Sequence, residues 1–277
     1  MSHKKALLFL IMTSLLWSSG GLLIKMVNWN PPAIAGMRSA IAVIFILLFT
    51  RKFHIKLTPI NIGGGIAYAL TVVLFVLSNK LTTAANAILL QFTAPIYVAI
   101  FSNWFLGEKN TRLDAAVIII VVCGMLLFFM DELSAGNMAG NITAILSGFA
   151  FAWLVLLMRK QKDGSPIDSI IIGNVITALF GIAFMFDKMP DMSSWIGLLL
   201  LGIFQLGLSY ILYSTAIKYV SAIEAILVPV IEPLLNPIWV LLFIGEKPGF
   251  FALIGGFIIL GAITFRSFYI VSKRPSI

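Results

Sequence analysis

A short pattern of residues occurs twice in this chain, at a spacing of half its length. Ala87-Ile88-Leu89, Pro95 and Gly107-Glu108-Lys109 recur as Ala225-Ile226-Leu227, Pro233 and Gly245-Glu246-Lys247. Each pair is offset by 138 residues (225 − 87, 233 − 95 and 245 − 107) in a chain of 277. The chain therefore consists of two copies of one unit, which we place at residues 1–133 and 134–277.

The composition places both units in a membrane. The sequence is 60% hydrophobic and 11% charged, with a mean hydropathy of +1.05. A soluble domain of this size cannot bury so much apolar surface. Long core helices of a soluble protein would need charged outer faces, whereas residues 6–27 contain one charged residue and residues 117–130 none. We therefore predict an all-α integral membrane protein.

Ten stretches are suited to cross the bilayer. A helix needs about 20 apolar residues to span the hydrocarbon core. Turn signals such as Asn28-Trp29-Asn30-Pro31-Pro32 and Lys162-Asp163-Gly164-Ser165-Pro166 separate the stretches. The predicted transmembrane helices are residues 6–27, 31–50, 60–80, 83–106, 112–130, 138–158, 166–186, 195–217, 221–244 and 248–270.

The distribution of positive charge predicts the orientation. With the N-terminus inside, 14 lysines and arginines fall on the cytoplasmic side and 3, Lys80, Lys188 and Lys247, on the outer side. Lys25 and Arg38 remain within spans. The positive-inside rule then predicts that both termini are cytoplasmic, in a multi-pass protein of the cell (cytoplasmic) membrane. Because topology accounts for the net charge of +8, we expect no nucleic-acid partner.

The repeat and the topology together predict inverted repeats. Each unit contains five spans, an odd number, so the second unit crosses the membrane in the opposite sense. Two inverted five-helix repeats around a central cavity can exchange conformations, which turns an inward-open cavity into an outward-open one. This is the arrangement that alternating access requires.

Short motifs carry a resemblance to a known family. Leu16-Trp17-Ser18-Ser19-Gly20-Gly21, followed by Lys25, Pro32 and Arg38, resembles the opening of an EamA-type repeat. The two copies of Pro-x11-Gly-Glu-Lys described above resemble its close. Over nearly its whole length the chain resembles the drug/metabolite transporter superfamily.

That resemblance implies a fold and a class of activity. It implies ten helices whose spans 1, 3, 4, 6, 8 and 9 line a central cavity, and secondary transport of a small metabolite, often export of amino acids or related compounds. The second repeat departs from the pattern. It keeps Trp153 but lacks the Ser-Gly run, and no arginine matches Arg38.

Ionisable side chains within spans are candidates for function. Each costs roughly 2.5–3.5 kcal/mol at the membrane centre and should face a cavity or a partner. Glu232 lies near mid-membrane and is either a structural acid or a proton or cation site; burial favours its protonated form, so it is our candidate for a coupling proton. Arg38 either bonds carbonyls or a carboxylate as scaffold, or contacts substrate. Lys25 is expected to extend to the interface and Glu224 to cap its helix.

Prolines predict weak points in two spans. Pro95 lies in the fourth span, and Pro229, Pro233 and Pro237 follow at four-residue spacing in the ninth. Each removes an intrahelical hydrogen bond, and freed carbonyls can serve as ligands or hinge points. We predict hinges at Pro95, Pro229 and Pro233, with a static kink as the alternative.

Polar and aromatic residues within the spans define the predicted substrate cavity. Deep tryptophans can form an aromatic wall for a cation, or simply pack against neighbouring helices. The predicted cavity residues are Trp17, Arg38, Asn79, Asn86, Gln91, Trp153, Gln205, Tyr210, Tyr213 and Glu232.

The remaining motifs point away from enzymes. The sequence contains no GxxxxGK[ST], HExxH or CxxC motif, so we expect no cofactor, no metal site and no catalytic activity. A channel would show a repeated ring of polar residues, whereas these are scattered over different spans.

The leading prediction is a secondary active transporter that exports an amino acid or related zwitterion by alternating access. Its expected partners are a small-molecule substrate and the lipid bilayer, with protons as the candidate coupling ion and a monomer or homodimer as the assembly. The alternative is a transporter of organic cations or quaternary amines, or a drug/proton antiporter, with an aromatic cavity. Whether Arg38 and Glu232 pair with each other distinguishes the two, and the sequence leaves this open.

Overall fold

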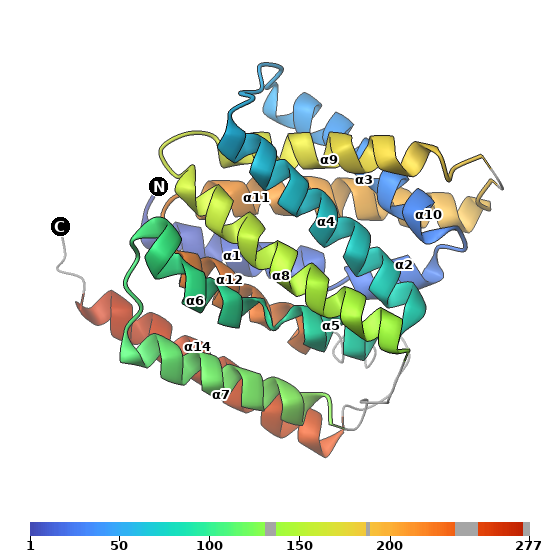
Figure 1. Ribbon diagram of the computed structural model, residues 1–277. Helices are drawn as coiled ribbons and strands as arrows, with labels where there is room; N and C mark the ends of the chain where they lie inside the picture. The colour runs from blue at the N-terminus through green and yellow to red at the C-terminus, as the bar shows by residue number, and fades with distance from the viewer. Residues whose placement is uncertain (131–136, 187–188, 236–248, 274–277) are drawn as a thin grey trace.

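Helices account for every regular element of the described chain. The computed structural model describes residues 1–130, 137–186, 189–235 and 249–273, and no strand occurs within them (Figure 1). Within these described residues, six helical stretches are long and apolar enough to cross a membrane. The prediction of an all-α integral membrane protein is thereby confirmed, while the count of ten spans and their inverted arrangement stay predictions.

The helices of the first unit follow the predicted spans. Two of the spans are each divided into two helices. The helices are α1 (His3–Trp17) with α2 (Gly20–Met26), α3 (Pro31–Thr50), α4 (Pro59–Leu81), α5 (Ala84–Gln91) with α6 (Ala94–Leu106), and α7 (Arg112–Phe128).

The second unit contains a continuous helix with an irregular centre. Its elements are α8 (Met138–Lys160), α9 (Pro166–Ile182), α10 (Met192–Leu200), the π-helical η1 (Leu201–Leu208), α11 (Ser209–Ala216), α12 (Ala222–Leu227), the 3-10 turn η2 (Val228–Val230) and α14 (Phe250–Lys273). Residues 231–235 are helical. Pro237, Lys188, the rest of the predicted span 221–244 and the second Gly-Glu-Lys motif lie outside the described residues.

Capping residues explain where several helices begin. Proline stands in the first turn of α3, α4 and α9, where its missing N–H has no intrahelical partner to lose. Thr111 and Asp114 form a capping box at α7, and Ser221 and Glu224 form another at α12. Glu224 therefore has the capping role expected of it.

Breaks in the helices fall at Ser-Gly and proline positions. The first span is interrupted at Ser18 and Ser19, next to two glycines. The fourth is interrupted at Phe92 and Thr93, just before Pro95, which occupies the first turn of α6. Pro229 lies within η2. Because proline cannot donate an intrahelical hydrogen bond, a helix is readily broken or tightened there.

Helices of the two units interleave. In the core, α4 packs against α8 and α9, α3 against α9 and η1, α1 against α11 and η2, and α6 against α8 and α12. The pair α7 and α14 lies at the edge of the bundle (Figure 1). Gly36 and Gly181 allow α3 and α9 to touch, since a Cβ built at Gly36 would lie 2.6 Å from the Cα of Gly181.

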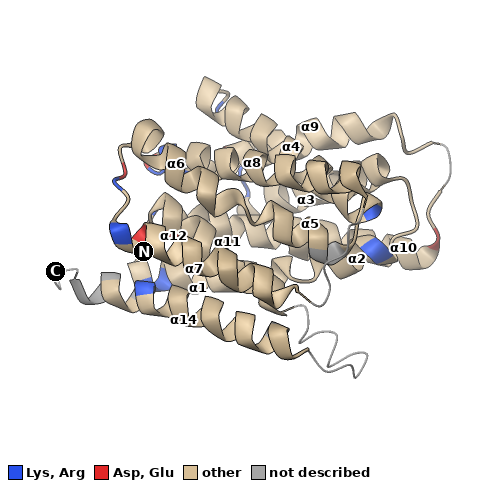
Figure 2. Cartoon of the chain, turned by 60° about the horizontal axis from the view of Figure 1, so that its bottom comes forward, with Lys and Arg blue, Asp and Glu red and all other residues tan. Residues whose placement is uncertain are grey.

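The outer surface suits a lipid environment. Large apolar side chains such as Trp104, Phe257 and Leu48 are more than 60% exposed. Most charged residues lie toward the ends of the helices, as Figure 2 shows. Helix α14 ends at the same end of the bundle where α1 begins (Figure 1). A bilayer is the environment in which such an apolar girdle with polar ends is stable.

Candidate functional site

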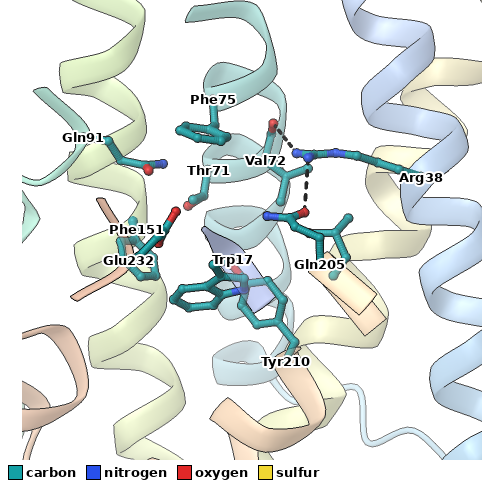
Figure 3. A pocket seen from close by; sticks show the side chains of 11 residues that line it. Trp17, Arg38, Thr71, Val72, Phe75, Gln91, Phe151, Gln205, Tyr210 and Glu232 are labelled. Carbon is teal, nitrogen blue, oxygen red and sulfur yellow. Dashed lines mark hydrogen bonds between the residues drawn. The ribbon is translucent and has the colours of Figure 1, made fainter. Parts of the chain in front are cut away.

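A cavity lies where helices of both units meet. Its lining comes from α1, α3, α4, α5, α8, η1, α11 and the helical residues 231–235. The lining residues are Trp17, Arg38, Thr71, Val72, Phe75, Gln91, Phe151, Gln205, Leu206, Tyr210 and Glu232 (Figure 3).

The cavity is small in this conformation. The space open to the centre of a water molecule is about 40 Å³. Each water requires roughly 10–15 Å³ by this measure, so the space holds on the order of three waters. A metabolite would need the surrounding helices to separate before it could enter.

Arg38 supplies a buried positive charge on one side of the cavity. Its side chain is 1% exposed, yet it has no acidic partner among the described residues. Nη1 donates to the side-chain oxygen of Gln205 and Nη2 to the carbonyl of Val72, both at 3.4 Å. Nε has no hydrogen-bond partner within the described chain. The guanidinium is therefore oriented by neutral groups and keeps unused donor capacity.

Glu232 supplies a carboxylate on the other side. It follows η2, is 9% exposed, and its carboxylate points into the cavity near Thr71 (Figure 3). Arg38 and Glu232 do not form an ion pair with each other, although both line this one space. The cavity therefore holds a guanidinium and a carboxyl group at separate places.

Aromatic rings form one wall of the cavity. The ring centroid of Trp17 lies 5.8 Å from that of Phe151, 5.1 Å from Tyr210 and 5.2 Å from Tyr213. The indole N–H of Trp17 donates to Ser209 Oγ at 2.9 Å, which fixes the plane of the ring.

A chain of hydrogen bonds fixes Gln91 on the side of Glu232. Gln91 Nε2 donates to Ser147 Oγ at 2.8 Å, and this hydroxyl donates to the carbonyl of Thr71 at 2.9 Å. The amide oxygen of Gln91 is left to face other partners. Helices α4, α5 and α8 are thereby joined beside the cavity.

The structure brings together six of the ten predicted cavity residues and places the other four elsewhere. The lining includes Trp17, Arg38, Gln91, Gln205, Tyr210 and Glu232. Tyr213 lies behind the aromatic wall, in contact with Trp17, and donates to the carbonyl of Ala225 at 3.1 Å.

Asn79, Asn86 and Trp153 do not line this cavity. The two asparagines lie at the end of the α4–α5 hairpin, where Asn79 donates to the carbonyl of Phe75 at 3.0 Å. Trp153 packs with Phe101, Phe105 and Phe149 beside an apolar groove between α4 and α8. It is therefore separate from Trp17, and the two do not form a common aromatic wall.

Sequence reasoning missed five side chains of the lining. Thr71 and Phe75 are one helical turn apart on α4 and so share a face. The polar side chain of Thr71 within an apolar span was the signal that could have identified this face. Phe151 lines the cavity where Trp153 was expected to. Trp153 comes two residues later in α8 and therefore lies on a different face of the helix. Val72 and Leu206 carry no polar signal.

Comparison with known proteins decides the family. Residues 4–130 and 138–268 each match the EamA-like transporter family. The chain belongs to this family. The predicted membership of the drug/metabolite transporter superfamily is thereby confirmed.

Curated relatives of this EamA-like protein are also transporters. The pseudopaline exporter CntI of Pseudomonas aeruginosa is 25% identical over 94% of each chain. The uncharacterized transporter YdfC of Bacillus subtilis is 25% identical over 95% of this chain and 92% of its own. An uncharacterized transporter of Archaeoglobus fulgidus is 29% identical over 73% of this chain and 74% of its own.

A solved structure shares the fold. One crystal structure superimposes with a TM-score of 0.81 at 16% identity, over 95% of this chain and 98% of the other. Its family membership and its apolar helices make the EamA-like protein a multi-pass membrane transporter with a small-molecule substrate. Transporters as a class are not enzymes.

Proposed function

We propose that this transporter exports an amino acid or related zwitterion by alternating access. The observation that carries the proposal is that Arg38 and Glu232 face one cavity without pairing with each other. An unpaired buried charge costs several kcal/mol, so a site that holds a guanidinium and a carboxyl group gains from a ligand that pairs with both.

A zwitterion fits the layout of the cavity. Its carboxylate can receive hydrogen bonds from the guanidinium of Arg38, whose planar fork suits a carboxylate. Its ammonium can donate to Glu232 and to the amide oxygen of Gln91. Trp17 and Tyr210 offer a wall for an apolar side chain between the two ends.

The packing of the helices supports inverted repeats. The offset of 138 residues relates α1 to α8, α3 to α9, and both η1 and α11 to parts of α4. The contact of α1 with α11 therefore corresponds to that of α8 with α4, and the contact of α3 with η1 corresponds to that of α9 with α4. The pairs α3–α9 and α7–α14 convert into themselves. The two successive family matches support the same division into 1–133 and 134–277. Such a pair of repeats can alternate between inward-open and outward-open forms.

Direction, location and coupling belong to the same proposal. The charge distribution favours the cytoplasmic membrane with both termini inside, and the relative named as an exporter favours export. Glu232 has no cationic partner among the described residues, which suits a carboxylate that exchanges a proton for substrate. The unit of transport is a monomer or homodimer, because the cavity is completed within one chain.

One observation favours an organic cation as the alternative substrate. Trp17, Phe151 and Tyr210 gather beside the unpaired Glu232, and aromatic faces attract cations. The positive charge of Arg38 opposes this reading, because it would repel a cation in so small a space.

The experiment compares these substrates directly. Purified protein is screened for thermal stabilisation by amino acids and by quaternary amines, and hits are tested for flux in proteoliposomes. Arg38→Gln and Glu232→Gln should each weaken zwitterion binding roughly tenfold or more, because a hydrogen bond to a charged group contributes about 1.5–3 kcal/mol. Arg112→Gln and Asp163→Asn, which change exposed charges, serve as matched controls. Stabilisation by quaternary amines that Arg38→Gln strengthens would establish the alternative.

A further inference from the structure

Two side-chain contacts at opposite ends of the bundle occupy equivalent positions in the two units. His3 and Glu224 meet at one end, and Asn86 and Asn141 meet at the other. The offset of the sequence repeat relates them: Asn141 corresponds to His3 (141 − 3 = 138) and Glu224 to Asn86 (224 − 86 = 138). Each contact therefore joins the start of the first helix of one unit to the start of the fourth span of the other.

The local structure around the two contacts is also equivalent. Asn86 lies three residues after Thr83, whose hydroxyl accepts from the Asn86 amide at the start of α5. Glu224 lies three residues after Ser221, whose hydroxyl accepts from the Glu224 amide at the start of α12. Both side chains are thus set by an N-cap, and 221 − 83 is again 138.

The His3–Glu224 contact contains an acidic side chain and lies beside ion pairs, so we call it the charged contact. His3 Nε2 lies 3.0 Å from Glu224 Oε1, and Glu224 is 2% exposed. Arg266 of α14 lies 3.9 Å from the same oxygen and pairs with Asp114 of α7 at 2.7 Å. This contact therefore draws charged groups from α1, α7, α12 and α14 together.

A second ion pair holds the same end of α12. Glu108 accepts from the backbone amide of Ala222 at 2.8 Å and pairs with Arg159 at 2.6 Å. Arg159 also donates to the carbonyls of Ile217 and Lys218 at 3.0 Å. The start of α12 is therefore fixed from both units.

The Asn86–Asn141 contact is neutral. Asn86 Nδ2 donates to Asn141 Oδ1 at 3.4 Å, and Thr82 donates to the same oxygen at 3.0 Å. Helix α8 approaches closely here, because a Cβ built at Gly140 would lie 2.9 Å from the backbone nitrogen of Thr82. This end is closed by amides and close packing.

Each contact stands at the head of an element that leads to the cavity. Helix α12 continues through η2 to Glu232, and α5 ends at Gln91. Each helix start is therefore connected through its own element to a residue of the cavity. With both contacts formed, the cavity has room for only a few waters.

We propose that His3–Glu224 and Asn86–Asn141 are paired latches, one charged and one neutral, that open alternately during transport. The proposal rests on alternating access as the proposed function. Opening the charged latch separates α12 from α1 and admits substrate from that end; opening the neutral latch separates α5 from α8 at the other. Because the latches differ in chemistry, substitutions can weaken one without the other and shift the population of the two open forms.

The experiment measures distances across both ends in the full chain. In a Cys123→Ser background, spin labels on Lys4→Cys and Tyr219→Cys report on the charged latch, and labels on Ile142→Cys and Leu81→Cys report on the neutral latch. All four residues are exposed, and the two pairs are themselves related by the offset of 138. Pulsed dipolar spectroscopy then gives a distance distribution for each end.

Opposite shifts are expected from the two latches. Glu224→Gln and His3→Asn should lengthen the Lys4–Tyr219 distance and leave the Ile142–Leu81 distance unchanged or shorter. Asn141→Ala should do the reverse. Asp168→Asn is the matched control, because it removes another buried carboxylate that pairs with a lysine, Lys52, outside the latches. It should lower thermal stability without lengthening either distance.

Several outcomes would overturn the latches. The proposal is wrong if Glu224→Gln leaves both distance distributions unchanged, or if it lengthens the distances at both ends. Zwitterion binding is measured on the same samples. Opposite shifts without zwitterion binding would uphold the latches and overturn the proposed substrate. Zwitterion flux without such shifts would uphold the proposed substrate and overturn the latches.

Discussion

The guanidinium of Arg38 donates to the side-chain oxygen of Gln205, 3.4 Å away, and both side chains are buried at the cavity. Gly20 leaves room for this amide, since a Cβ there would lie 2.9 Å from Gln205 Nε2. The partner is neutral, so it orients the charge of Arg38 without cancelling it. Gln205 is therefore a positioning residue for the cavity.

Exchange of this amide for an acid should block the site. Gln205→Glu places a carboxylate beside Arg38, and the ion pair that forms would take the donors that the substrate needs. We expect substrate affinity to fall at least about tenfold, while thermal stability is kept or raised. Gln205→Met, which keeps the length but removes the acceptor, should weaken binding less. Unchanged affinity in Gln205→Glu, measured by titration of the stability shift, would argue against a substrate contact at Arg38.

Trp17 should matter more for stability than an exposed tryptophan. Trp17→Ala removes a buried ring that three aromatic side chains contact, and large-to-small changes of this kind cost about 3–5 kcal/mol. Trp17→Phe keeps a ring but loses the hydrogen bond to Ser209, so it should cost about 1 kcal/mol beyond the loss of ring area. Trp104→Ala, at a side chain that is 76% exposed, is the control and should change the free energy of unfolding little. Reversible unfolding in mixed micelles measures all three.

Much of the helical framework was predictable because its signals are local. Apolar length identifies a span, and Thr111, Ser221 and the prolines at positions 31, 59 and 166 mark helix starts through their own backbone chemistry. The break before Pro95 follows from the missing amide hydrogen. None of these features depends on which helices become neighbours.

The cavity was predictable only in part, because it depends on the rotation of each helix. In α8 the apolar residues surround the whole helix, so the sequence does not distinguish the face of Phe151 from that of Trp153. Two residues along a helix amount to about 200°, and the structure turns Phe151 to the cavity and Trp153 to the groove beside α4. Likewise, the separation of Arg38 from Glu232 is a property of tertiary packing that spacing along the chain does not contain.

Glu232 should determine how transport responds to a proton gradient. Glu232→Gln keeps the shape of the side chain but cannot release a proton. In proteoliposomes we expect it to abolish acceleration of flux by an imposed pH gradient, while exchange between equal substrate pools continues. Asp163→Asn, which changes an exposed acid outside the cavity, should keep the response to the gradient. Gradient-driven flux at the normal rate in Glu232→Gln would assign the coupling to another group.

The contact between α3 and α9 gives the sharpest test of the packing. A Cβ at Gly36 would lie 2.6 Å from the Cα of Gly181, closer than two carbon atoms can approach, and the neighbour is backbone that cannot turn aside. Gly36→Ala should therefore push α3, which carries Arg38, away from α9, at a cost of about 1–3 kcal/mol in the free energy of unfolding. Gly63→Ala is the matched control on α4, where the nearest atom to the new methyl group would be a side-chain carbon of Leu157 at an ordinary 3.7 Å. That substitution should be neutral or slightly stabilising, because alanine also favours the helix over glycine by up to about 1 kcal/mol. Equal losses of stability in the two variants would show that α3 and α9 do not approach so closely in the membrane. The position of Arg38 at the cavity would then also be wrong.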